Sequence, residues 1–283
     1  MEKDKIVRIA QKAGFCFGVD RALKIVYNEL EKNRKIATLG EIIHNSDVCM
    51  ELEQKGVRVI TKAAELCPDE ICILPSHGAT FDIRNEILLK GGKDATCPKV
   101  KHILETVSEL ETDMVFIMGE EEHVEIKGIV SYCTICYKVF HNSAVLEDFL
   151  VKSSQILKKY IAIISQTTYN TDDWEKSVEI LKKYNLDFVQ YNTICKATYL
   201  RQKETEEIAK DSDVVFVIGG YNSSNTIKLV EISRKYCKTY HIRNAGDLNR
   251  EMFENARKIG ITAGASTPSY VIQSVAKYIK GEQ

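Results

Sequence analysis

The chain has 283 residues and a nearly balanced charge, with 39 Lys and Arg against 40 Asp and Glu. This length allows two or three compact units, and a net charge of -1 argues against nucleic-acid binding and against binding to an anionic membrane. The first residues are charged and no apolar stretch approaches about eighteen residues, so we expect no signal or transit peptide and no membrane span. In the cytoplasmic protein that we therefore expect, nine cysteines indicate metal binding or thiol chemistry rather than disulfides.

Three segments of the chain repeat the same predicted order of elements, each beginning at a cysteine. Apolar residues recur at helical spacing after Cys16 and after Cys97, and residues 196–210 after Cys195 predict a more polar helix. An apolar strand then leads into the loops "GEIIHN", "GEEEHVE" and "GGYNSSN", whose first glycines lie 24, 22 and 24 residues beyond the respective cysteines. A second strand in each segment ends in "PSHGA", "SQTTY" or "AGAST".

The repeat predicts an α/β fold of three modules with mainly parallel sheets, at residues 1–95, 96–192 and 193–283. Ligands of such sheets collect at the carboxyl ends of the strands, so we expect one cysteine and two polar loops per module to converge on one centre. The expected contributions are Cys16, His44 and His77 from the first module, Cys97, His123, Glu125 and Thr167 from the second, and Cys195, Ser223, Asn225 and Ser266 from the third.

Cys16, Cys97 and Cys195 each precede a predicted helix. Unpaired backbone N–H groups and positive potential at a helix amino terminus favour thiolate over thiol. Three such thiolates suit either a zinc ion with a fourth ligand or an iron–sulfur cluster with one iron left open to substrate.

A competing metal site is the pair Cys133 and Cys136, spaced C-x-x-C, with Cys67 and Cys72 as companions. Four residues separate Cys67 from Cys72, and both pairs lie in apolar, strand-like sequence. We therefore disfavour zinc at this position.

The six polar loops carry short hydrogen-bonding side chains next to predicted helix amino termini. Such a set suits an anion with many acceptor oxygens, namely a phosphate or a diphosphate. The set comprises His44, His77, His123, Thr167, Thr168, Ser223, Ser224, Asn225 and Ser266. Neither a Walker lysine nor a G-x-G-x-x-G pattern occurs, which argues against nucleotide binding by those routes. Glu125, two residues beyond His123, is the candidate proton donor, with a raised pKa if it is shielded from water.

The motifs "GFCFGVDRA", "IIHN", "SHG", "DATCP", "QTT", "TICKAT" with "RQ", "NSSN" and "AGASTP" resemble, in order and over essentially the whole chain, the 4-hydroxy-3-methylbut-2-enyl diphosphate reductase (IspH/LytB) family. The resemblance implies reductive removal of an allylic hydroxyl to give isopentenyl and dimethylallyl diphosphates, the last step of the methylerythritol phosphate route to isoprenoids. It also implies three pseudo-symmetric α/β modules around a central cavity.

The resemblance further implies one 4Fe-4S cluster per chain and an electron donor of the ferredoxin or flavodoxin type. Cys16, Cys97 and Cys195 would hold the cluster. The diphosphate would be bound by His44, His77, Ser223, Ser224, Asn225 and Ser266. His123 would line the cavity, Thr167 would lie near the substrate hydroxyl, and Glu125 would deliver protons.

The chain departs from the family pattern where His123-Val124-Glu125-Ile126 replaces the common His-Pro-Glu-Val. Two other functions stay open at this point. An iron–sulfur hydro-lyase also uses an open cluster corner but needs no external electrons, and a zinc-bearing module that binds phosphorylated metabolites would hold no iron.

Overall fold

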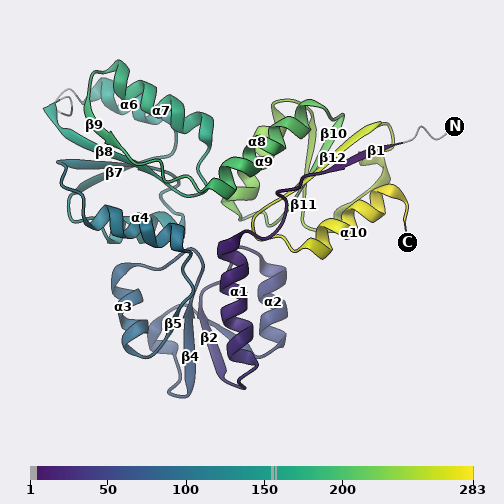
Figure 1. The fold of residues 1–283 in the computed structure, drawn as a ribbon, viewed down its shortest axis with the longest axis horizontal. Coiled ribbons are helices and arrows are strands. Elements are labelled where there is room, and N and C mark those ends of the chain that lie inside the picture. The colour runs from purple at the N-terminus through teal and green to yellow at the C-terminus, as the bar shows by residue number, and fades with distance from the viewer. Residues whose placement is uncertain (1–4, 154–155, 157, 283) are drawn as a thin grey trace. The chain divides into compact units, whose positions relative to one another are not determined.

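The computed structural model of the protein describes residues 5–153, 156 and 158–282. The chain forms two compact units, of which the first comprises Met1–Asp20, Ile43–Glu51 and Lys196–Gln283 and the second Arg21–Ile42 and Leu52–Cys195. The described residues form three four-stranded parallel sheets that alternate with helices (Figure 1). The predicted α/β class with repeated parallel sheets is therefore confirmed, whereas the module boundaries after residues 95 and 192 stay predictions.

The first unit holds the sheet with strand order β1, β12, β10, β11, in which all neighbours are parallel. Its strands are β1 (Ile6–Ile9), β10 (Val214–Ile218), β11 (Lys238–Ile242) and β12 (Lys258–Ala263). Its helices are α8 (Lys196–Lys210), α9 (Ser224–Arg234) and α10 (Ser269–Lys280), with short 3-10 turns at Ala245–Asp247 and Arg250–Met252. The edge strand β1 comes from the start of the chain, so this sheet joins segments that are distant in sequence.

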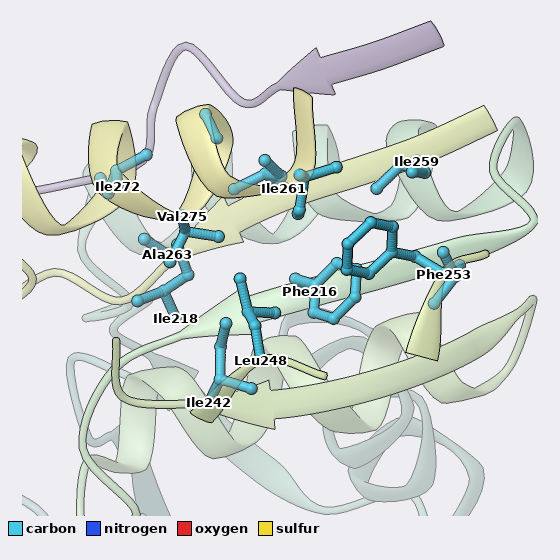
Figure 2. Close-up of a cluster of buried hydrophobic side chains, with 13 residues drawn as sticks. Phe216, Ile218, Ile242, Leu248, Phe253, Ile259, Ile261, Ala263, Ile272 and Val275 are labelled. Carbon is cyan, nitrogen blue, oxygen red and sulfur yellow. The ribbon is translucent and has the colours of Figure 1, made fainter. Parts of the chain in front are cut away.

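Both faces of this sheet are covered, which is why its central strand β10 is apolar at every position. Phe216 and Ile218 belong to a buried cluster with residues of α10, shown in Figure 2 around the Phe216 ring. Val215 and Val217 belong instead to a second cluster, with Ile208 of α8 and residues of α9. Because successive side chains of a strand point to opposite faces, one continuous apolar run supplies both cores.

The second unit holds the other two sheets, which repeat this strand order. One sheet runs β3, β2, β4, β5 and the other β7, β6, β8, β9, again with parallel neighbours. The strands are β2 (Lys35–Leu39), β3 (Val57–Ile60), β4 (Glu70–Leu74), β5 (Lys93–Asp94), β6 (Met114–Met118), β7 (Cys136–Phe140), β8 (Tyr160–Ser165) and β9 (Asp187–Gln190). The helices are α3 (Phe81–Leu89), α4 (Pro98–Ser108), α5 (Val124–Ser131), α6 (Ser143–Lys152) and α7 (Thr171–Lys183), with a 3-10 turn at Ala63–Glu65.

Two further helices, α1 (Phe17–Leu30) and α2 (Ser46–Gln54), begin in the first unit and end in the second. No described helix is both long enough and apolar enough to cross a lipid bilayer.

In each sheet of the second unit the chain starts at an inner strand, moves to the edge on one side and returns to the other side, and strands β10, β11 and β12 of the first unit follow the same path. The order therefore reverses between β2 and β4, between β6 and β8, and between β10 and β12. Ligands of open parallel sheets bind beyond the carboxyl ends of the strands at such a reversal. The polar loops singled out in the sequence follow these six strands.

Candidate functional site

In the first unit, the amino terminus of α9 lies at the reversal between β10 and β12. Ser223 precedes this helix, and its Oγ accepts a 3.4 Å hydrogen bond from the backbone N–H of Thr226. Ser223, Ser224 and Asn225 are each only 4% exposed. Neither polar atom of the Asn225 side chain has a hydrogen-bond partner among the described residues, although the burial of an unpaired amide is costly. An unpaired buried amide at a helix amino terminus is suited to an incoming anion.

Two glycines allow α9 to lie close to the ends of β10 and β12. A Cβ on Gly219 would stand 2.6 Å from Oγ1 of Thr226, and a Cβ on Gly264 would overlap the same oxygen. Gly219 also has a φ of +152°, which disfavours other residues. The glycines thus bring the first turn of α9 against the ends of β10 and β12 and keep its N–H groups at the reversal.

His44 and Ser266 come together beside this helix terminus. The Ser266 hydroxyl donates to the backbone carbonyl of His44 at 2.8 Å, and the Asn45 side chain donates to the carbonyl of Ser266 at 2.6 Å. Asn45 also caps α2, since its Oδ1 accepts from the N–H of Val48 at 3.1 Å. Burial lowers the pKa of His44, so its imidazole is neutral near pH 7. A neutral imidazole offers one donor and one acceptor nitrogen.

Glu125 and Thr167 bridge the reversal between β6 and β8 in the second unit. Glu125 is 3% exposed in the first turn of α5, and one carboxylate oxygen accepts from the N–H of Thr167 at 2.6 Å. The other oxygen accepts from the Thr167 hydroxyl at 2.7 Å. Burial raises the pKa of Glu125 and outweighs these two hydrogen bonds, which lower it. A carboxyl in this setting holds its proton more readily than an exposed one, as a proton donor requires.

His123 precedes α5 as its capping residue. Its Nδ1 accepts from the N–H of Glu125 at 3.1 Å, so a neutral ring carries its proton on Nε2. The replacement of the usual proline by Val124 leaves α5 starting directly after this cap. In the neighbouring loop, the Thr168 hydroxyl accepts from the Gln166 side chain, just after the end of β8, at 2.9 Å.

The three cysteines Cys16, Cys97 and Cys195 have one backbone feature in common. Each N–H donates to a carbonyl of a loop that follows a strand, from Cys16 to Ala265 at 3.0 Å, from Cys97 to Ser76 at 2.8 Å and from Cys195 to Thr167 at 3.0 Å. Each cysteine directly precedes its helix, α1, α4 or α8, and all three are half-buried.

The backbone bonds of the cysteines also determine which loops lie beside them. His77 follows Ser76 and so lies next to Cys97 in the second unit, and Thr167 adjoins Cys195 there. Ser266 follows Ala265 and adjoins Cys16 in the first unit. The structure therefore places a predicted substrate-binding loop against every one of the three cysteines.

The competing zinc cysteines are placed differently. Cys72 is fully buried in β4, and Cys133 is half-buried just after α5. Burial raises the pKa of both thiols to about 11, which favours the protonated form over a thiolate ligand. Within neither unit do three described His, Cys, Asp or Glu side chains gather around a common metal position.

Asn45 was not among the residues singled out in the sequence, although it orders the Ser266 loop. Its signal is its position directly before a helix that begins "SDV", where asparagine is a favoured cap. The side chain caps the helix and also donates to the carbonyl of Ser266. Ser266 is distant in the sequence and comes near only in the folded unit.

Comparison with known proteins connects this geometry to one family. A model of the LytB protein family matches residues 7–280. A relative from Caldanaerobacter subterraneus subsp. tengcongensis, named 4-hydroxy-3-methylbut-2-enyl diphosphate reductase, is 42% identical over 97% of this chain and 96% of its own length. A relative from Clostridium perfringens with the same name is 38% identical over 99% of both chains.

Two solved structures are similar to the whole chain. One, described as (E)-4-hydroxy-3-methyl-but-2-enyl diphosphate reductase, the terminal enzyme of the non-mevalonate pathway, is 36% identical, with a TM-score of 0.68 and 99% of both chains covered. The other, the E-1-hydroxy-2-methyl-but-2-enyl-4-diphosphate reductase from Plasmodium falciparum, is 28% identical, with a TM-score of 0.89 over 99% of this chain and 91% of that one.

Proposed function

The chain belongs to the LytB protein family, and we propose that it reduces (E)-4-hydroxy-3-methylbut-2-enyl diphosphate to isopentenyl and dimethylallyl diphosphates. The allylic C–O bond breaks, two electrons and two protons are taken up, and the oxygen leaves as water. The remaining proton can add at either end of the allyl group, which accounts for two products. This reaction would be the last step of the methylerythritol phosphate route.

The observation that carries the proposal is the buried, unpaired side chain of Asn225 at the amino terminus of α9. Its amide would donate to a diphosphate oxygen, together with the hydroxyls of Ser223 and Ser224 and the helix N–H groups. Ser266 and the neutral His44 would complete the anion site from the adjoining loop. His77, in the second unit, is proposed as a further ligand of the diphosphate.

Glu125 would supply a proton at the reacting end of the substrate. Its raised pKa makes the carboxyl a readier proton carrier than an exposed glutamate, and the two hydrogen bonds from Thr167 hold both of its oxygens in place. Thr167 would in turn lie near the substrate hydroxyl, and His123 would line the cavity. Because His123 caps α5 and Glu125 lies in the first turn of that helix, α5 positions both side chains together.

Cys16, Cys97 and Cys195 would hold one 4Fe-4S cluster per chain. The donor set fits such a group, because three cysteines at helix amino termini can ligate three irons and leave the fourth iron for substrate. When bound, the cluster would supply the electrons and a Lewis-acidic iron. We propose a ferredoxin or flavodoxin as the electron donor and the reducing cytoplasm as the location.

The test is an anaerobic assay of the purified protein with the hydroxylated diphosphate and a reduced viologen dye. We expect both isoprenoid diphosphates, with turnover that requires the reduced dye, and about four irons and four sulfides per chain. A Cys97→Ser variant should lose iron and activity together, whereas a Cys136→Ser variant should keep both. A folded, iron-free protein, or turnover without reductant, would contradict the proposal.

A further inference from the structure

Arg201 is a buried arginine whose guanidinium holds the segment before Cys16 within the first unit. It is 3% exposed on α8, its Nε donates to the carbonyl of Lys12 at 2.9 Å and its Nη2 donates to the carbonyl of Gly14 at 2.7 Å. Hydrogen bonds from a charged donor to a backbone carbonyl are stronger than those from a neutral donor. The segment that ends at Cys16 is thus anchored to a helix far away in sequence.

Glu204, one turn later on α8, binds the same segment through the backbone N–H groups of that segment. Its two carboxylate oxygens accept from the N–H of Gln11 at 2.8 Å and of Lys12 at 2.7 Å. Four hydrogen bonds therefore connect α8 to residues 11–14. The N–H of Cys16 itself donates to the carbonyl of Ala265, so the backbone is held both ahead of Cys16 and at its own amide.

Arg21 plays the corresponding part before Cys97 within the second unit. From α1 it donates through Nη1 to the carbonyl of Thr96 at 3.2 Å and through Nη2 to the carbonyl of Asp94 at 3.4 Å. In both cases one guanidinium spans two alternate carbonyls just ahead of the cysteine. The flat, forked guanidinium can reach two acceptors in this way, whereas a lysine ammonium is a single point.

The segment before Cys195 is held differently. There the hydroxyl of Thr193 accepts from the N–H of Ser165 at 2.8 Å and donates to the Ser165 carbonyl at 2.5 Å. This neutral threonine bridge replaces the guanidinium, and it provides an internal comparison for the two arginine-held cysteines.

We infer that Arg201 and Arg21 are positioning residues that fix the thiols of Cys16 and Cys97 for cofactor binding. The inference rests on the proposed cluster for its purpose, and on the hydrogen bonds of the two guanidinium groups for its physical content. Loss of the fork frees two carbonyls and lets the segment ahead of that cysteine open locally. The effect is specific to one cysteine in each case.

The test measures alkylation by iodoacetamide at each cysteine of the full-length protein by peptide mass spectrometry. The anaerobically purified protein is labelled with its metal in place and again after iron is removed by a chelator. Arg201→Lys should speed labelling of Cys16 about tenfold after iron removal, while Cys97 and Cys195 stay within about twofold of wild type. Arg21→Lys should give the same increase at Cys97 alone. Both variants should also lose iron to the chelator faster than wild type.

The matched control is Arg58→Lys, because Arg58 also donates to a backbone carbonyl, that of Glu65 at 2.6 Å, but lies next to none of the three cysteines. It should change none of the three labelling rates. If Arg201→Lys does not fold, Glu204→Gln tests the same segment and should accelerate Cys16 labelling about threefold. Equal acceleration at all three cysteines, or no acceleration, overturns the inference.

The labelling result is separate from the proposed reaction. A wild-type protein that binds no iron would contradict the proposed function, yet the selectivity of labelling would still test the two arginines. Normal iron binding with unselective labelling would contradict the positioning role alone.

Discussion

Glu125→Gln separates proton delivery from structure, because glutamine matches the shape and the hydrogen bonds of this carboxyl. The amide oxygen can still accept from the N–H of Thr167, which lies 2.6 Å from one carboxylate oxygen. The amide nitrogen can donate to the Thr167 hydroxyl, which lies 2.7 Å from the other. What the variant loses is the acidic proton.

The structural cost of this change is small, because the amide keeps both hydrogen bonds with Thr167 and replaces a carboxyl that burial already holds more readily in its neutral form. The difference is about 1 kcal/mol, or about 2 °C in melting temperature for a protein of this size. Loss of a general acid typically slows turnover about 100-fold to 10,000-fold, which corresponds to about 3 to 5 kcal/mol in the barrier. The catalytic effect should therefore exceed the stability effect several-fold in energy.

The assay compares kcat, KM, iron content and melting temperature of Glu125→Gln with those of wild type under anaerobic conditions. We expect kcat to fall at least about 100-fold while KM and iron content change less than about threefold. The control Glu121→Gln changes an exposed glutamate of the same loop and should leave all four quantities unchanged. Turnover of Glu125→Gln at the wild-type rate would refute the assignment of the proton donor.

Three further predictions concern stability and binding. Burial raises the pKa of Glu125 above 4.5, so its contribution to stability is complete below pH 4.5 and is lost as pH rises through the folded-state value. The melting temperature of Glu125→Gln should therefore gain on that of wild type as pH rises above 4.5. Asn225→Ala removes an unpaired buried amide, so it should raise the melting temperature of the ligand-free protein by about 2 °C. The same variant should raise KM about tenfold, and an unchanged KM would exclude a contact between Asn225 and the diphosphate. Gly264→Ala would press a Cβ against Thr226 and should cost about 1 to 3 kcal/mol in denaturant unfolding, whereas Gly128→Ala, whose Cβ would meet only ordinary contacts at 3.5 Å, should not destabilise.

Local sequence signals were sufficient for the fold class, because each strand and helix is encoded within a few neighbouring residues. The apolar run of β10 predicts a strand covered on both faces, and the spacing after Cys97 predicts α4. The strand partners were not encoded locally. The edge strand β1 pairs with β12, about 250 residues further along the chain, through backbone hydrogen bonds. Such bonds do not depend on the order of side chains along either strand, so the sequence pattern does not identify the partner.

The sequence alone determined which residue types form the candidate site, because thiols at helix starts, short hydroxyls beside glycines and a glutamate after a histidine carry chemistry that spacing makes visible. Tertiary structure alone decided how these groups act on one another. Packing brings Thr167 to Glu125, which accepts its two hydrogen bonds, and brings Arg201 to the backbone before Cys16. Packing also leaves the buried amide of Asn225 without a hydrogen-bond partner among the described residues. The raised pKa of Glu125, the energetic cost of the unpaired Asn225 amide and the fixed backbone before Cys16 all depend on burial and on distances between atoms. A local sequence pattern contains neither kind of information.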